Sequence, residues 1–395
     1  MKRRYSKTVL FSLFLLVLMQ RPITADAADP VQNTDPAQNT DSPKTAEEYL
    51  ETMTLEEKIA QMFMITPEAL MGEGTVTNVD GTFQESLKAH PVSGLIYFSK
   101  NLQSEEQVRQ MLQTTMEAGQ NVNGLPLFQG VDEEGGDVTR IYKSGILEIE
   151  DVGSMAAIGA TNDPQKAREA GAILGSYLGD LGFNLDFAPV ADVLTNPDNL
   201  VVRTRSFGSD PELVCSMVCQ ELEGLKSQGV YGTLKHFPGH GATRQDSHTG
   251  YASTDRTLEQ IKTEELLPFQ AGIDTGASFV MAGHISAPEI TGNDIPASLS
   301  QEMITEILRE DMGYDKIVIT DALNMGAISQ KYGSGEAAIL SVEAGADILL
   351  MPADFEAASH RLTEAVRSGR IPESRIDQSV LRILRVKMEL QKNME

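Results

Sequence analysis

The chain has 395 residues, 41% of them hydrophobic, which is enough for one large domain or two ordinary ones. Its formal net charge of -25 argues against a nucleic-acid-binding protein, which needs a basic surface, and against adhesion to anionic membranes or wall polymers. We therefore expect a soluble globular protein with no nucleic-acid partner.

The N-terminus has the build of an export signal. An apolar run over 9–19, broken only by Ser12, follows a basic start and precedes the small-residue site Ala25-Asp26-Ala27. The basic residues are Lys2, Arg3, Arg4 and Lys7. Because the run is short for a membrane span, cleavage is favoured over an uncleaved anchor. We expect residues 1–27 to be a signal peptide and the protein to be secreted or extracytoplasmic in a bacterium, without stable membrane insertion after cleavage.

A polar segment over 28–44 follows, with Val31 as its only large apolar residue. Such a composition cannot bury enough surface to order itself, so it predicts a disordered tether. The folded part is then expected over 45–395.

Short apolar runs alternate with helical patterns along this folded part. The runs cover 62–65, 94–98, 127–131, 183–188, 232–234, 279–282, 317–320 and 348–351. They are apolar throughout rather than alternating, which is typical of parallel strands buried on both faces. The intervening patterns end with a helix near 376–390.

Helix-start signals support the alternation. Thr54 with Glu57 and Ser104 with Gln107 predict capping boxes, and Ser300 opens a further helical pattern. Asp163-Pro164 and Asp210-Pro211 place a capping residue before proline at the first helical position. Eight strands alternating with helices predict a (β/α)8 TIM-type barrel. A doubly wound open sheet is the alternative, but it would need a G-x-G-x-x-G turn, which the sequence lacks.

Polar residues stand at or just after the ends of several predicted strands. They are Asp132, Asp192, Lys235 with His236, His284 and Asp321. In a barrel these positions converge on the C-terminal rim, where active sites are built.

The first polar group is the run Asp132-Glu133-Glu134-Gly135-Gly136, with Arg140 shortly after it. A carboxylate and a guanidinium there could bind sugar hydroxyls, and a Gly-Gly turn with solvated acids is the alternative. Arg205, in RTRSFG, is a second guanidinium with the same two interpretations. Between these groups and the next strand, Cys215 and Cys219 lie four apart on a predicted helix and read as small buried hydrophobes rather than a metal site.

The stretch from Lys235 to His248, KHFPGHGATRQDSH, holds three of the six histidines in an irregular, glycine-containing loop. Asp246 lies two residues before His248, so its carboxylate could orient an imidazole that gives and recovers a proton near neutral pH. A hydrogen bond that only stabilises the loop is the alternative. His236, His240 and His248 could instead bind a metal, although Pro238 and Gly239 interrupt the helical spacing that zinc sites use.

Asp321 follows the strand in IVITDALNM. It is either the N-cap of a helix beginning at Ala322 or a rim carboxylate able to attack an anomeric carbon.

Together these segments resemble glycoside hydrolase family 3, in its β-N-acetylglucosaminidase branch, over most of the chain from about Thr45. The motifs that carry the resemblance are KHFPGHG followed by DSH, DEEGG with Arg140, DFAPVADV, RSFG and ITDALNM. The resemblance implies a retaining double displacement in which Asp321 is the nucleophile and His248, assisted by Asp246, is the acid/base. It also implies a set of sugar-binding residues: Asp132, Arg140, Arg205, Lys235 and His236.

Two residues depart from the branch's pattern. Asp137 stands where arginine often follows the Gly-Gly pair, and Glu133 replaces a frequent glutamine. Both add negative charge near Asp132, and we expect them to affect sugar affinity.

The resemblance therefore implies a single-domain exo-β-N-acetylglucosaminidase acting on peptidoglycan fragments or related glycans, with no metal or organic cofactor. A β-N-acetylglucosaminide phosphorylase or another family 3 β-glycosidase is a close alternative. A histidine-ligated metal-dependent hydrolase and a glycan-binding module without turnover are the more distant ones.

Overall fold

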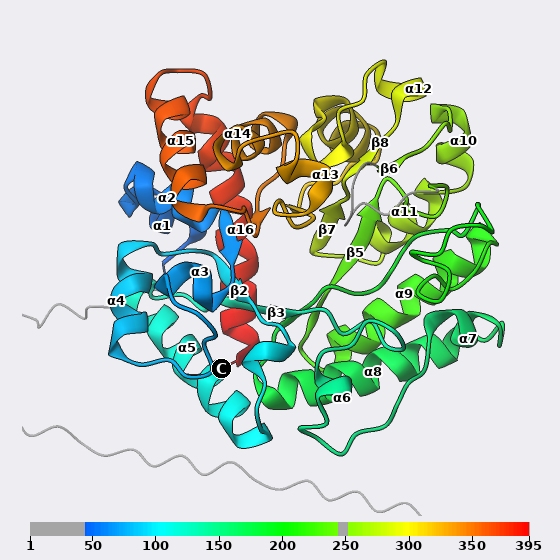
Figure 1. Cartoon of the computed structure of the whole chain (residues 1–395), viewed down its shortest axis with the longest axis horizontal. Helices are drawn as coiled ribbons and strands as arrows, with labels where there is room; N and C mark the ends of the chain where they lie inside the picture. The colour runs from blue at the N-terminus through cyan, green and yellow to red at the C-terminus, as the bar shows by residue number, and fades with distance from the viewer. Residues whose placement is uncertain (1–43, 244–251, 395) are drawn as a thin grey trace, which may run out of the picture. The chain divides into compact units, whose positions relative to one another are not determined.

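The structure, a computed structural model, describes residues 44–243 and 252–394, and its centre is a sheet of eight parallel strands (Figure 1). The strands are β1 (Phe63–Ile65), β2 (Gly94–Ile96), β3 (Phe128–Val131), β4 (Leu185–Asp186), β5 (Tyr231–Phe237), β7 (Phe279–Ala282), β9 (Ile317–Thr320) and β10 (Leu349–Leu350). Neighbours follow chain order, β10 pairs with β1, and a parallel bridge between Ile319 and Ile348 closes the ring. The predicted (β/α)8 barrel is confirmed, and the open-sheet alternative is wrong.

Helices surround the strands. They are α1 (Ala46–Thr52), α2 (Leu55–Gln61), α3 (Pro67–Met71), α4 (Gly81–Ala89), α5 (Glu105–Asn123), α6 (Ile141–Ser144), α7 (Met155–Gly159), α8 (Pro164–Leu181), α9 (Pro211–Ser227), α10 (Leu258–Thr263), α11 (Leu266–Asp274), α12 (Pro288–Thr291), α13 (Gly326–Ser329), α14 (Ser334–Ala344), α15 (Phe355–Arg367) and α16 (Glu373–Met394), with the short turns η1 (Ser99–Asn101) and η2 (Ala297–Leu299) and the π-helix η3 (Glu302–Asp311). Over 44–243 and 252–394, every helix is too short or too polar to cross a bilayer.

The predicted helix starts are largely confirmed. Thr54 and Glu57 form a complete capping box, and Asp163 and Asp210 each accept an N–H in the first turn of their helix. At Ser104 only half of the predicted box forms. Its hydroxyl accepts from Gln107 N, but the Gln107 amide oxygen accepts from Gln103 N instead of turning back to Ser104.

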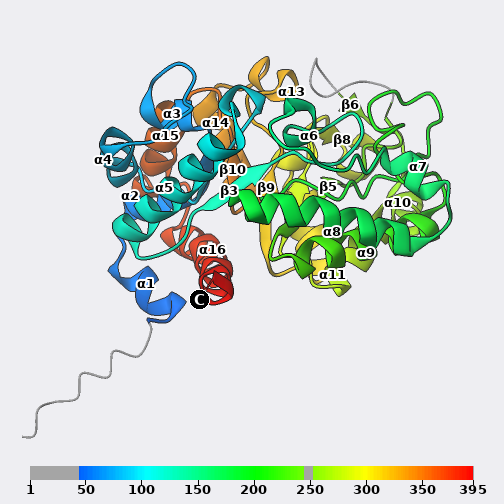
Figure 2. The ribbon, with the colours of Figure 1, turned by 90° about the horizontal axis from the view of Figure 1, so that it is seen from below.

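Helices α8 and α9 lie side by side against the barrel (Figure 2). Two glycines permit the close approach. A Cβ on Gly171 would come within 2.4 Å of Glu221 O, and one on Gly224 within 2.4 Å of Arg168 O. The free cysteines Cys215 and Cys219 lie on α9 and are half-buried.

A second small sheet, which the sequence analysis did not predict, pairs β6 (Ala252–Ser253) with β8 (Ile285–Ser286) in parallel. Both strands are two residues long. Such a short pair carries no hydrophobic periodicity that could be read from the sequence.

The inside of the barrel is apolar at its N-terminal end. Inward side chains of the strands, including Phe128 and Phe279, form one cluster with Ile383, Val386 and Leu390 of α16. The last helix therefore covers the base of the barrel. Within this base, Lys387 is fully buried, and its Nζ lies 5.5 Å from the centre of the Phe128 ring.

A buried carboxylate holds α16 in place. Asp347, between β9 and β10, is paired with Arg309 Nη2 at 2.6 Å and with Arg382 Nη1 of α16 at 3.2 Å. Ser379 Oγ, also on α16, donates to Asp347 Oδ1 at 2.6 Å. Although burial acts to raise it, the three nearby arginines, with Arg375 the third, hold the pKa of Asp347 below its usual value.

Candidate active site

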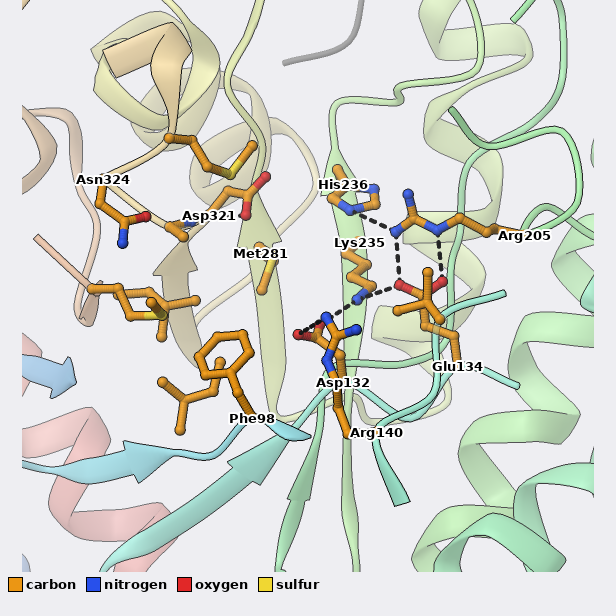
Figure 3. Close-up of a pocket in the computed structure, with 16 residues that line it drawn as sticks. Phe98, Asp132, Glu134, Arg140, Arg205, Lys235, His236, Met281, Asp321 and Asn324 are labelled. Atoms are coloured by element: carbon orange, nitrogen blue, oxygen red, sulfur yellow. Dashed lines mark hydrogen bonds and ion pairs between the residues drawn. The ribbon is translucent and has the colours of Figure 1, made fainter. Parts of the chain in front are cut away.

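A cavity of about 280 Å³ opens at the C-terminal rim of the barrel (Figure 3). Its lining includes the end of β2, the segment after β3, the end of β5 and the segments after β9 and β10. Six of the residues singled out from the sequence line it together: Asp132, Arg140, Arg205, Lys235, His236 and Asp321. The expected convergence of strand ends on one rim is therefore found.

Glu134 is the centre of the charged side of this cavity. It is 1% exposed, and its two oxygens accept from Arg205 Nε and Nη2, both at 2.7 Å. Its Oε1 also pairs with Lys235 Nζ at 2.6 Å. Burial acts to raise the pKa of Glu134, but Arg205 and Lys235 outweigh it and hold that pKa well below its usual range.

Asp132 extends the same network into the cavity. Its Oδ1 is 3.0 Å from Lys235 Nζ, and its Oδ2 is 3.3 Å from Arg140 Nη2. The Arg140 guanidinium also lies over the Phe98 ring, 5.7 Å from its centre. Burial acts to lower the pKa of Lys235, and the carboxylates of Glu134 and Asp132 more than compensate by raising it. The lysine is thus held as a cation.

His236 joins the cavity to a buried carboxylate behind it. Its Nδ1 is 2.8 Å from Asp192 Oδ2, and its Nε2 is 3.4 Å from Arg205 Nη2. Asp192 Oδ1 accepts the backbone N–H of His236 at 3.2 Å and that of His240 at 2.6 Å. His240 is buried, and this burial lowers its pKa to about 4, so His240 is neutral at pH 7.

Asp321 lies directly after β9 and across the cavity from Glu134 and Arg205 (Figure 3). Its backbone N–H donates to Ala282 O at 2.9 Å, and its Oδ1 accepts from Ala322 N at 2.8 Å. The next helix, α13, begins only at Gly326 with Met325 at its cap position. The interpretation of Asp321 as a helix N-cap is therefore wrong. His284 does not line the cavity, but its Nε2 lies 2.9 Å from Ala322 O and fixes the backbone beside Asp321.

The side of the cavity near Asp321 is mostly apolar, and it was not expected from the sequence. It consists of Ile96, Phe98, Met281, Ala322, Met325, Leu350 and Met351. Met351 has a φ of 48°, in the left-handed region that a non-glycine residue rarely adopts, so backbone strain is stored in the cavity wall.

The two departures from the branch's pattern, Glu133 and Asp137, lie outside the lining of the cavity. Glu133 is buried beneath α6, where it accepts the backbone N–H groups of Ile141 at 2.8 Å and Tyr142 at 2.9 Å and the Tyr177 hydroxyl at 2.9 Å. Asp137 is exposed and accepts from Thr204 Oγ1 at 2.7 Å. Neither residue lines the cavity.

Asp246 and His248 lie outside the described residues, and so does part of the alternative metal site, which included His248. In the part of the chain that the structure describes, no group of three or more His, Cys, Asp or Glu side chains is arranged to hold a metal ion. The His236 and His240 rings are 5.8 Å apart between centres, and they meet edge to face.

Sequence reasoning missed Glu134 as a member of the site and noted Asp192 only for its place on the rim. The signal for Glu134 was its position in the acidic run after β3, but three successive acids gave no means of telling which would point inward. The apolar residues were missed because an isolated Met or Phe after a strand resembles ordinary core.

Comparisons with known proteins converge on one family. Residues 54–386 match the Glycosyl hydrolase family 3 N terminal domain. The chain is 31% identical over 371 residues to Beta-hexosaminidase A of Pseudoalteromonas piscicida, covering 86% of this chain and 62% of that relative. It is 39% identical over 272 residues to Beta-hexosaminidase LpqI of Mycobacterium tuberculosis, covering 67% and 68%.

Among solved structures, that of a glycoside hydrolase family 3 beta-N-acetylglucosaminidase from Paenibacillus sp. str. FPU-7 matches with a TM-score of 0.79 and 37% identity. The match covers 86% of this chain and 63% of that one. The chain thus spans less than two thirds of the length of the Pseudoalteromonas relative and of the Paenibacillus structure.

Proposed function

The chain belongs to glycosyl hydrolase family 3, and from this premise we propose that it is an exo-acting, retaining β-N-acetylglucosaminidase. The observation that carries the proposal is the shared cavity: Asp321 faces it from the end of β9, opposite a network of sugar-binding candidates from β3 and β5. Relatives and a solved structure of similar sequence carry beta-hexosaminidase and beta-N-acetylglucosaminidase names, which supports the same activity.

The charged side of the cavity suits a sugar ring. Asp132 offers carboxylate oxygens, and Lys235 and Arg140 offer N–H donors at 3.0 and 3.3 Å from them, so neighbouring hydroxyl groups can both donate and accept. The cavity of about 280 Å³ is close to the lower end of small-molecule sites, which are roughly 300–1,000 Å³. This size supports the binding of one terminal sugar rather than a length of chain.

The proposed chemistry has two steps. Asp321 attacks the anomeric carbon and forms a glycosyl ester while His248, assisted by Asp246, gives its proton to the departing glycosidic oxygen. His248 then takes a proton from the water that attacks the ester, which releases the sugar with its configuration retained. A carboxylate and an imidazole supply the nucleophile and the proton transfer, so no cofactor is invoked.

The natural substrate that we propose is an N-acetylglucosamine-terminated glycan, such as a peptidoglycan fragment. The predicted N-terminal export signal supports this choice, because an exported bacterial enzyme meets such glycans outside the cytoplasm. We accordingly propose a secreted or extracytoplasmic location for the protein.

Trapping the covalent intermediate tests the proposal. A slow fluorinated N-acetylglucosaminyl substrate analogue is incubated with the enzyme, and the labelled peptide is mapped by mass spectrometry. We expect the label on Asp321. A label on another carboxylate would remove Asp321 as the nucleophile.

Product analysis on an aryl N-acetyl-β-glucosaminide separates the competing activities. Free N-acetylglucosamine in both the presence and the absence of phosphate supports hydrolysis, whereas a sugar 1-phosphate indicates a phosphorylase. Activity that chelation abolishes and zinc restores would indicate a metal-dependent hydrolase. Saturable binding of the glycan without turnover would indicate a binding module.

A further inference from the structure

Asp192 lies behind the cavity, where it contacts His236 but is not part of the lining. It is 0% exposed and belongs to the segment after β4, which pairs with β5 through the bridge between Val190 and Lys235. Its carboxylate accepts three N–H groups, two from backbone amides and one from an imidazole. None of the roles described above for the cavity residues explains this concentration of donors on one buried acid.

These contacts give the two carboxylate oxygens of Asp192 different hydrogen-bond partners. Oδ1 accepts the backbone N–H of His236 at 3.2 Å and of His240 at 2.6 Å, so it must be an acceptor. Oδ2 lies 2.8 Å from His236 Nδ1. Burial acts to raise the pKa of Asp192, but His236 and the other donors hold it below its usual value, so the group is a carboxylate at neutral pH.

An ionised Oδ2 accepts but cannot donate, so the proton of a neutral His236 ring must sit on Nδ1. The other ring nitrogen, Nε2, then carries a lone pair toward the cavity, where Arg205 Nη2 lies 3.4 Å away (Figure 3). His236 therefore presents an acceptor to the cavity. The Arg205 contact is long at 3.4 Å, so a hydroxyl of the bound sugar can donate to the same lone pair at a shorter distance.

We propose that Asp192 is a positioning residue that fixes His236 as a hydrogen-bond acceptor for a sugar hydroxyl. The proposal rests on the function given above, in which His236 contacts the terminal sugar. The geometry makes the effect of one isosteric change specific. In Asp192→Asn, the amide oxygen keeps the two backbone N–H groups, so the amide NH2 faces His236 Nδ1.

That NH2 donates to Nδ1 and moves the ring proton to Nε2. The Nε2–H of His236 then points at the Arg205 guanidinium, so two hydrogen-bond donors face each other. A sugar hydroxyl can no longer donate to Nε2, because this nitrogen has lost its free lone pair. The loss affects ground-state and transition-state binding of the sugar alike. For Asp192→Asn we expect KM to rise about 10- to 100-fold with kcat little changed, which is the range for the loss of one hydrogen bond to the sugar.

The test combines nitrogen NMR of the histidine ring with kinetics on full-length enzyme. The His236 signals are assigned by their disappearance in His236→Gln. In the wild-type enzyme at neutral pH, Nδ1 is expected to carry the proton, and in Asp192→Asn Nε2 is expected to carry it. A wild-type ring protonated on Nε2 overturns the proposal without the need for any variant.

Asp210→Asn is the matched control, because Asp210 caps α9 through Glu212 N and asparagine caps equally well. It should change neither the His236 signals nor KM. If Asp192→Asn only misfolds part of the protein, the apparent kcat falls while KM stays, and that result counts against positioning. A third result separates this inference from the proposed function. If the ring proton moves in Asp192→Asn but the wild type has no N-acetylglucosaminidase activity, Asp192 still fixes the His236 tautomer and the proposed function is overturned.

Discussion

Arg205 and Glu134 meet through two parallel hydrogen bonds of 2.7 Å, and Glu134 is 1% exposed. The pair brings the segment after β4 to the segment after β3, and Lys235 of β5 completes it at 2.6 Å. Three walls of the cavity thus depend on one acid. The acid itself needs no contact with substrate to do this.

Removing that acid should destabilise the protein. Glu134→Ala leaves the buried Arg205 without its carboxylate partner and Lys235 with Asp132 alone, which costs about 3–5 kcal/mol in the free energy of unfolding. Chemical denaturation followed by circular dichroism measures this value, with the exposed Glu150→Ala as control. A loss no larger than that of the control would show that Arg205 and Lys235 do not need Glu134.

Replacing the proposed nucleophile should abolish turnover and leave the fold intact. Asp321→Ala is expected to lower kcat on an aryl N-acetyl-β-glucosaminide by on the order of 10³-fold or more, because no glycosyl ester can form. The control is Asp315→Asn, an exposed acid before β9 at the opposite end of the strand. Activity of Asp321→Ala near the wild-type rate would exclude Asp321 as the nucleophile.

The proposed acid/base should show a rate loss that depends on the leaving group. His248→Ala is expected to slow hydrolysis of poorly activated glycosides by about 10²–10⁴-fold. A substrate with a good leaving group needs little protonation, so it should still form the glycosyl ester, which then accumulates and is released faster by added azide. The absence of both accumulation and azide rescue would contradict an acid/base role for His248.

The buried Lys387 should make stability depend on pH. Burial lowers the pKa of its amine to about 7 from the ordinary value of 10.5, and its Nζ has no hydrogen-bond partner among the described residues. Between these two values the unfolded chain binds more protons than the folded one, so the free energy of unfolding rises with pH in this window.

Lys387→Met removes the cost of giving up this proton on folding and is expected to stabilise the protein by a few kcal/mol at pH 7, at roughly 1.4 kcal/mol for each unit by which the pKa is lowered. Urea denaturation at pH 7 and at pH 9.5 should show this advantage shrinking at the higher pH. Lys392→Met, an exposed change on the same helix, is the control. Equal effects of the two variants would mean that burial does not lower the pKa of Lys387.

The barrel could be predicted because its signals are local. Each strand is a short apolar run, and the caps at Thr54, Asp163 and Asp210 are read within four residues. The convergence of Asp132, Lys235 and Asp321 then follows from the barrel itself, since all strands end at the same rim.

The direction of individual side chains could not be predicted in this way. Glu133 and Glu134 are neighbours in one acidic run, yet Glu133 turns beneath α6 and Glu134 turns toward Arg205. The direction of each side chain depends on partners that are distant in the sequence, and Arg205 is 71 positions from Glu134. The same holds for Asp192, whose partner His236 is 44 positions away.

Helix α16 fills the base of the barrel with Ile383, Val386 and Leu390, and within residues 44–243 and 252–394 these side chains close that end to the cavity. A sugar that enters at the rim must leave by the rim. On the proposed function, the released N-acetylglucosamine and the next glycan bind the same cavity, so free N-acetylglucosamine should inhibit hydrolysis competitively.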